Sequence, residues 1–265
     1  MNPRRHLSRK ACLMDLQLSG KRVLVTGGTR GIGRALVEAF LDEGAVVGFC
    51  ARKPEEVAAT QDALQDRGRV TGTAVDVADS DALAAWVEQA AEAFGGLDVV
   101  VANVSALAIP DTEENWQISL NVDVMHTVRL VRAALPHLER SDAPSIIAIS
   151  SVSGRESDFA SGPYGTAKTA IVGYIHGLAL QLADKRIRAN TVSPGNTYFE
   201  GGAWANIETG NPSLFEMAVG LNPTGHMGTP EDIAGPVVFL ASPRARRVSG
   251  TNLIVDGALT RGIQL

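Results

Sequence analysis

Apolar residues along this chain of 265 residues gather in short runs that alternate with longer stretches of helical spacing. The first run, Arg22–Thr26 (RVLVT), ends in a pair of glycines, and the stretch after it has the apolar spacing of a helix. Short apolar runs bounded by turn residues are typical of buried strands, and the longer spacing is typical of helices. The pattern predicts strands over 22–26, 45–50, 70–77, 97–103, 145–150, 187–192 and 252–255. It predicts helices over 31–43, 55–67, 79–94, 115–138, 164–183 and 230–241.

Regular alternation of strand and helix predicts parallel βαβ units with right-handed crossovers. The expected fold is therefore a single-domain α/β Rossmann-type doubly wound parallel sheet of about seven strands with helices on both faces. No linker or change of composition divides residues 14–265, so we expect one domain there. Residues 1–13 are basic and lack periodicity, and we expect them to be an extension outside the fold.

Composition and charge narrow the classes of function. Apolar residues make up 45% of the chain and charged residues 20%, which is ordinary for a protein with a hydrophobic core. The net charge of −5 and the lack of a basic stripe argue against nucleic acid and membrane surfaces as partners. The two cysteines, Cys12 and Cys50, belong to no metal or disulfide motif, so we expect no metal site and a reducing, cytoplasmic setting.

A glycine-rich turn joins the first predicted strand to the first predicted helix. Thr26–Gly33 reads TGGTRGIG, in which Gly27, Gly31 and Gly33 set the spacing. Glycines here allow the backbone to approach a pyrophosphate, which binds the exposed N–H groups at a helix N-terminus. A tight turn without a ligand stays open as an alternative. A P-loop is excluded, because no Lys-Ser or Lys-Thr pair follows Gly33.

A tyrosine and a lysine four residues apart mark the start of the helix predicted over 164–183. Pro163 suits the first turn of a helix, and the spacing places Tyr164 and Lys168 on one face. A free tyrosine titrates near pH 10, and a neighbouring ammonium group favours its ionised form. The pair can therefore serve as a general acid/base near neutral pH, although this spacing also occurs by chance on helices.

With both motifs in place, the chain resembles the short-chain dehydrogenase/reductase family, and in particular its 3-oxoacyl-[acyl-carrier-protein] reductase branch. The resemblance covers about residues 16–257. Two positions depart from the family pattern, because Val104-Ser105 replace an Ala-Gly pair and Phe199 stands where Thr is common. The further matches follow in the family's order: Asp76-Val77, Asn103, Asn121 in LNVDVM, Ser151, Pro194-Gly195, GTPED over 228–232 and Val255-Asp256-Gly257.

The resemblance implies four catalytic residues, Asn121, Ser151, Tyr164 and Lys168. Tyr164 would exchange a proton with the substrate oxygen, and Ser151 would donate a hydrogen bond to the same oxygen. Lys168 would hold the nicotinamide ribose, and Asn121 would anchor a water that connects Lys168 to solvent. The implied cofactor-binding residues are Gly27, Thr29, Arg30, Ile32, Gly33, Arg52, Asp76, Val77, Asn103, Tyr164, Lys168 and Thr197.

The end of the second predicted strand indicates which cofactor binds. An NAD enzyme usually has an acidic residue there, which accepts a hydrogen bond from the ribose 2′-hydroxyl. Here the chain reads CARK over 50–53, without an acid. Arg52 and Arg30 could clamp a 2′-phosphate as charge-assisted donors, although both could also be solvated surface cations. We therefore expect NADP(H) to be favoured over NAD(H).

The remaining predictions concern substrate, assembly and rival functions. The connection at about 196–225 is long and carries aromatic residues, which favours a lid over a small, apolar carbonyl or alcohol substrate. The helix over 164–183 carries few charges, which favours a homotetramer or homodimer. The expected function is NADP(H)-dependent interconversion of a carbonyl and a secondary alcohol by hydride transfer. A catalytically idle NADP-sensing protein and an epimerase or dehydratase relative stay open as alternatives.

Overall fold

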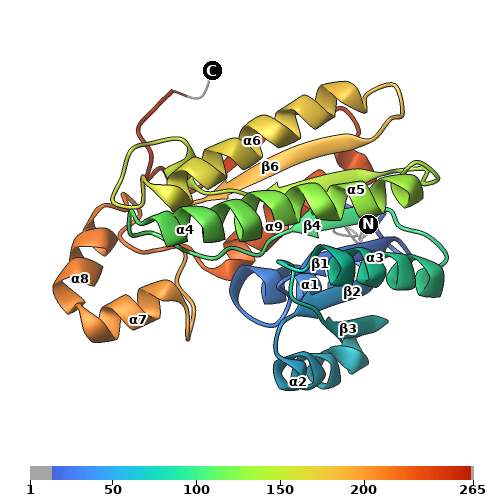
Figure 1. The fold of residues 1–265 in the computed structure, drawn as a ribbon, viewed down its shortest axis with the longest axis horizontal. Coiled ribbons are helices and arrows are strands. Elements are labelled where there is room, and N and C mark those ends of the chain that lie inside the picture. The colour runs from blue at the N-terminus through green and yellow to red at the C-terminus, as the bar shows by residue number, and fades with distance from the viewer. Residues whose placement is uncertain (1–13, 264–265) are drawn as a thin grey trace, which may run out of the picture.

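The computed structural model describes residues 14–263 (Figure 1). The extension expected over residues 1–13 lies outside these described residues. In the described part of the chain, no helix combines the length and the apolar character needed to cross a membrane.

The core of the fold is a parallel sheet of seven strands in the order β3-β2-β1-β4-β5-β6-β7. The chain reverses its direction of winding at β1, which pairs with β2 on one side and β4 on the other. The predicted doubly wound sheet is therefore confirmed, and its switch point lies between β1 and β4. The strands are β1 (Arg22–Thr26), β2 (Val46–Ala51), β3 (Val70–Ala74), β4 (Val99–Ala102), β5 (Ser145–Ile149), β6 (Arg188–Pro194) and β7 (Asn252–Val255).

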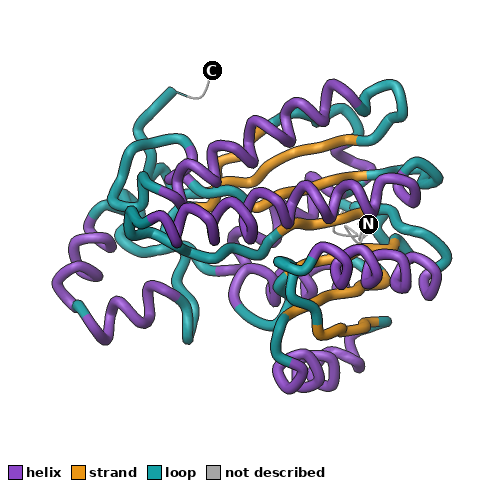
Figure 2. The backbone as a smooth tube through the Cα atoms, in the orientation of Figure 1, coloured by secondary structure: helices purple, strands orange, loops and turns teal. Residues whose placement is uncertain are grey.

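Helices cover both faces of the sheet, as the tube in Figure 2 shows. One layer contains α3, α5 and α6, and the other contains α1 and α9 with α2 near the β3 edge. The pair α7 and α8 projects from the body at one end of the sheet (Figure 1). The helices are α1 (Gly31–Asp42), α2 (Pro54–Leu64), α3 (Ser80–Phe94), α4 (Glu113–Ile118), α5 (His126–Leu138), α6 (Pro163–Gln181), α7 (Ala203–Gly210), α8 (Pro212–Gly220) and α9 (Pro230–Ala241).

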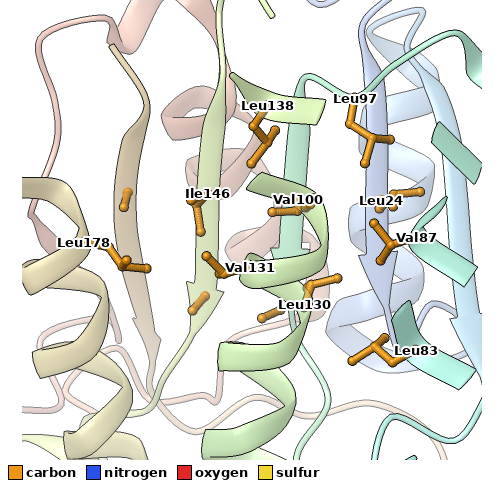
Figure 3. Packing of buried hydrophobic residues seen from close by; sticks show 14 of the residues in the cluster. Leu24, Leu83, Val87, Leu97, Val100, Leu130, Val131, Leu138, Ile146 and Leu178 are labelled. Carbon is orange, nitrogen blue, oxygen red and sulfur yellow. The ribbon is translucent and has the colours of Figure 1, made fainter. Parts of the chain in front are cut away.

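Alternate side chains of the central strands supply the two halves of the core. Leu24, Val100 and Ile146 point toward α3, α5 and α6, where they pack with Val87 and Leu130 among others (Figure 3). The neighbouring strand residues point toward α1 and α9 on the opposite face. Strands of a parallel sheet are buried on both faces, which explains why they read as continuous apolar runs in the sequence.

Three elements differ from the sequence prediction. The third strand ends at Ala74 rather than at residue 77, because Asp76 folds the chain into a turn by accepting from the Ala78 N–H at 2.9 Å. The helix predicted over 115–138 begins at Glu113, capped by Thr112, and contains a π-helical stretch over Ser119–Met125. The segment expected as a lid loop over 196–225 contains the helices α7 and α8.

Candidate active site

The glycine turn between β1 and α1 has a conformation that requires glycine. Gly27 and Gly31 have φ angles of 73° and 53°, in the left-handed region. A Cβ atom on Gly33 would lie only 1.9 Å from the carbonyl oxygen of Gly27. The turn therefore brings bare backbone to the N-terminus of α1, where unpaired N–H groups favour an anion.

Asn103 ties the glycine turn to the end of β4, across the switch point of the sheet. Its side-chain amide donates to the carbonyl oxygens of Thr26 and Gly27, at 3.0 and 3.3 Å. Its backbone N–H donates to the Thr26 hydroxyl at 3.0 Å. The next residue, Val104, packs so closely on Gly27 that a Cβ there would lie 2.9 Å from the valine methyl. This valine fills space at the floor of the site, as its larger size relative to the family's small pair predicts.

Ser151, Tyr164 and Lys168 converge where β5 ends and α6 begins. The Ser151 oxygen accepts from the Ser153 N–H at 3.2 Å, which leaves its own O–H free to donate. Lys168 lies one helical turn after Tyr164, with its ammonium nitrogen 5.6 Å from the centre of the phenol ring. The lysine is 2% exposed, and its ammonium donates to the carbonyl oxygen of Ile149 at 3.1 Å.

The role implied for Asn121, to anchor a water that connects Lys168 to solvent, stays a prediction. The side-chain oxygen of Asn121 accepts from Arg129 at 2.8 Å, and Arg129 also donates to the carbonyl oxygen of Ala78. The residue beside the lysine is Asp123, whose carboxylate lies 3.2 Å from the Lys168 nitrogen. Asp123 lies in the π-helical stretch, which turns side chains through a different angle from a regular helix. Asp123 is therefore a buried neighbour of Lys168 that the sequence did not single out.

His126, the first residue of α5, is a second buried residue that the sequence did not single out for this site. Its Nε2 lies 3.0 Å from the hydroxyl of Thr26, at the end of β1. Burial lowers the pKa of this imidazole from 6.5 to about 4, despite the opposing effect of Asp123. His126 is therefore neutral near pH 7 and anchors α5 to the sheet.

A cleft of about 680 Å³ runs along the carboxyl ends of the strands and opens over these residues. Ser151 lines it, whereas Asn121 does not. The cleft also contains Lys53, Glu56 and Leu107, which the sequence analysis did not select. Every residue predicted to bind the cofactor lines it, namely Gly27, Thr29, Arg30, Ile32, Gly33, Arg52, Asp76, Val77, Asn103, Tyr164, Lys168 and Thr197.

One end of the cleft is rich in positive charge. Arg30 and Arg52 line it, and neither has a carboxylate within 4.0 Å among residues 14–263. Lys53 is paired with Glu56 at 2.7 Å, so its charge is partly compensated. The two arginines are therefore the cations available to an anionic ligand at this end.

Part of the cleft lining is apolar. Leu107, Phe199, Ala203 and Trp204 contribute to it, and Trp204 packs edge-on against Phe159 with ring centres 6.0 Å apart. Phe199 covers the start of α1 beside Arg30, because a Cβ on Gly31 would lie 2.5 Å from the phenylalanine ring. Ala203 and Trp204 begin α7, so this helix supplies part of the cleft wall. Among the described residues, no cluster of His, Cys, Asp and Glu is arranged to hold a metal ion.

Comparison with known proteins gives the same picture of the chain. A family model described as Enoyl-(Acyl carrier protein) reductase matches residues 27–260. Isoepoxydon dehydrogenase patN of Penicillium expansum is 42% identical over 254 residues, which span 93% of this chain and 97% of that protein. The chain belongs to the short-chain dehydrogenase/reductase family. Within this family, 3-oxoacyl-[acyl-carrier-protein] reductase FabG of Vibrio cholerae is 31% identical over 248 residues, covering 92% of this chain and 99% of that protein.

Solved structures of short-chain dehydrogenases/reductases share the architecture. L-Sorbose reductase from Gluconobacter frateurii, complexed with NADPH and L-sorbose, superposes with a TM-score of 0.87 at 28% identity. The match covers 94% of this chain and 100% of that one. A short-chain dehydrogenase from Burkholderia cenocepacia in complex with NADP gives a TM-score of 0.81 at 30% identity, covering 91% and 98% of the two chains.

Proposed function

We propose that this protein is an NADP(H)-dependent oxidoreductase that interconverts a carbonyl group and a secondary alcohol. The observation that carries the proposal is the convergence of Ser151, Tyr164 and Lys168 in one cleft with the glycine turn. The relatives named as dehydrogenases and reductases support the same reaction class.

The cleft suits a phosphorylated dinucleotide. The close approach of Gly33 to Gly27 leaves a bare backbone cradle at the start of α1, which fits a pyrophosphate. Arg30 and Arg52 supply charge-assisted donors for a 2′-phosphate, and the strand end lacks the acid that an NAD ribose favours. Neighbours solved with NADPH or NADP support this choice of cofactor.

The protein's own groups provide acid/base chemistry at the substrate oxygen. Bound NADP(H) supplies or accepts the hydride at the carbon atom. In reduction, Tyr164 donates its phenolic proton to the carbonyl oxygen, and in oxidation its phenolate accepts the proton from the alcohol. The Ser151 hydroxyl donates to the same oxygen and stabilises the negative charge that develops there. Lys168 places a positive charge beside the phenol and holds the ribose.

The substrate that this site favours is small and mostly apolar. Leu107 and Trp204 give the cleft apolar wall, and the Trp204 indole packs edge-on against the Phe159 ring. Two relatives that are 42% and 41% identical are named isoepoxydon dehydrogenases, so isoepoxydon belongs in the first panel of substrates. The apolar walls favour ring alcohols or ketones of similar size over open-chain polyols.

We also propose that the enzyme is an oligomer and is cytoplasmic. Thr169, Ala170, Gly173 and Leu180 lie exposed along α6, and Leu180 is 82% exposed. A helix face that is uncharged and rich in small residues suits close packing against another subunit, so we propose a homotetramer or homodimer. The Cys50 thiol is buried and free, and burial raises its pKa to about 12, so the thiol is unreactive near neutral pH.

Exchange of the tyrosine tests the proposed reaction. Tyr164→Phe should lower turnover of NADPH with a panel of cyclic ketones by at least about a hundredfold, because it removes the general acid. The affinity for NADPH, measured by fluorescence titration, should change by less than about threefold, because the hydroxyl acts on the substrate oxygen.

Tyr174→Phe on the same helix is the matched control, because Tyr174 is half-buried and does not line the cleft. It should keep turnover within about twofold of the original enzyme. Activity of Tyr164→Phe within tenfold of the original enzyme would contradict the acid role of Tyr164.

A further inference from the structure

The ammonium group of Lys168 is paired with a carboxylate inside the protein. The Asp123 oxygen lies 3.2 Å from the lysine nitrogen, and the two side chains are 0% and 2% exposed. The second carboxylate oxygen accepts from the backbone N–H of Ala106 at 3.1 Å. Asp123 therefore connects the π-helical stretch, the loop after β4 and the catalytic helix α6.

Lys168 has close neighbours on three sides. Its ammonium donates to the Ile149 carbonyl oxygen at 3.1 Å. The Asp123 carboxylate lies 3.2 Å from the same nitrogen as an ion-pair partner, and the Tyr164 ring centre lies 5.6 Å away. The carboxylate thus helps to hold the ammonium group in position beside Tyr164.

Asp123 also changes the charge that Tyr164 experiences. Two other titratable groups pack around this pair, His126 and Arg129, both on α5. Burial keeps His126 neutral near pH 7, and Arg129 is bound to Asn121 and the Ala78 carbonyl oxygen. The lysine is therefore accompanied by a negative charge in a region of low dielectric, where charges act strongly on their neighbours.

We propose that Asp123 is a positioning residue, whose carboxylate orients Lys168 and offsets part of its charge, so that Tyr164 ionises at a higher pH than beside Lys168 alone. The effect on the ionisation of Tyr164 does not depend on the proposed function. Its consequence does, namely that the carboxylate sets the pH range in which Tyr164 exchanges protons with a substrate. An enzyme with this pair would oxidise alcohols best in a more alkaline range than the same enzyme with a neutral residue at position 123.

The test follows ionisation of Tyr164 directly, by the ultraviolet absorbance of tyrosinate in the full chain without substrate. The chain contains three tyrosines. The pKa of Tyr174 is raised by burial, and that of Tyr198 is raised by its hydrogen bond to Glu208. Subtracting the titration of a Tyr164→Phe partner in each background isolates the signal of Tyr164.

Two variants remove the charge in different ways. Asp123→Asn keeps the shape of the side chain, and Asp123→Ser leaves room for a water. The midpoint of the Tyr164 signal should fall by about one pH unit in both, because a nearby carboxylate disfavours the phenolate. Circular dichroism melts show which variant is folded, and either folded variant decides the question. Asp142→Asn is the control, since it makes the same change at an exposed side chain ahead of β5.

A midpoint that stays in place or rises in a folded Asp123 variant overturns the proposal. So does an equal fall in Asp142→Asn, which would reflect net charge alone. Failure of the proposed function is a separate result, because it would appear as continued turnover in Tyr164→Phe, whereas the titration needs no turnover.

Discussion

We expect cofactor choice to depend on two arginine side chains that line the cleft. Arg30 and Arg52 should give a preference for NADPH over NADH of well over tenfold in kcat/KM. A charge-assisted hydrogen bond contributes about 1.5–3 kcal/mol, and about 1.4 kcal/mol corresponds to a factor of ten. Replacing Ala51 by Asp together with Arg52→Ala should reverse the preference, because the new carboxylate accepts from a ribose hydroxyl and repels a phosphate. The measurement is kcat/KM for both cofactors at fixed ionic strength.

Arg247→Ala is the matched control for the charge change, because Arg247 is exposed and does not line the cleft. It should leave the ratio between the cofactors unchanged. Equal use of NADPH and NADH by the original enzyme would contradict the clamp and make both arginines ordinary surface cations.

The sequence predicts which site residues lie close together where a rigid local motif fixes their spacing. Lys168 lies one helical turn after Tyr164, so their proximity follows from helix geometry alone. The contact between Lys168 and Asp123 joins elements that are far apart in the chain, and no local spacing reveals it. The motif LNVDVM contains Asp123 as well as Asn121, but the family pattern marks only Asn121.

At the scale of elements, the π-helical stretch Ser119–Met125 is the feature that the sequence did not reveal. Its residues have the apolar and polar spacing of an ordinary helix, and the change of register depends on contacts with α6 and the loop after β4. The pair α7 and α8 was also missed as helices. Asn211 caps α8 by accepting from the Leu214 N–H at 3.2 Å, and Pro212 follows it at the first helical position.

The buried His126 at the start of α5 predicts how the stability of the fold depends on pH. The pKa of His126 is lowered from 6.5 to about 4 by burial, so the folded protein resists protonation that the unfolded chain accepts. The contribution of the neutral His126 imidazole to the free energy of unfolding is fully present above pH 6.5. It is lost as the pH falls from 6.5 toward 4. The loss amounts to about 3 kcal/mol in the free energy of unfolding, at about 1.4 kcal/mol per pKa unit.

His126→Gln should remove this dependence, because the amide can still bond to Thr26 but does not titrate. Urea unfolding at a series of pH values gives both curves, and other acids affect the two proteins alike. As the pH falls, the original protein should lose more stability than His126→Gln, so the difference between the two proteins should shrink or reverse in favour of the variant. Parallel curves from neutral pH to pH 4 would show that His126 is not a buried neutral imidazole.

At the scale of the whole molecule, the sequence predicted the fold almost completely. Each of the seven strands was located, although only central strands such as β4 and β5 are buried and nearly all apolar, whereas β3 (VTGTA) lies at an edge and is partly exposed. The arrangement of the site at the carboxyl ends of β1, β4 and β5 followed from the topology. The shape of the substrate end did not follow, because it depends on where α7 packs and on side chains such as Leu107 that carry no motif.

The assembly of the whole molecule is testable through the uncharged face of α6. Ala170 is exposed on this face and lies between Thr169 and Gly173. Ala170→Lys should reduce the mass in analytical ultracentrifugation from that of an oligomer to that of a smaller species, because an interface would bury the new charge unpaired. Ala59→Lys on α2 is the matched control, since Ala59 is also exposed and Glu55 lies one turn before it. It should leave the oligomer intact. A monomeric original protein, or equal masses for both variants, would mean that the face of α6 is solvated rather than covered by another subunit.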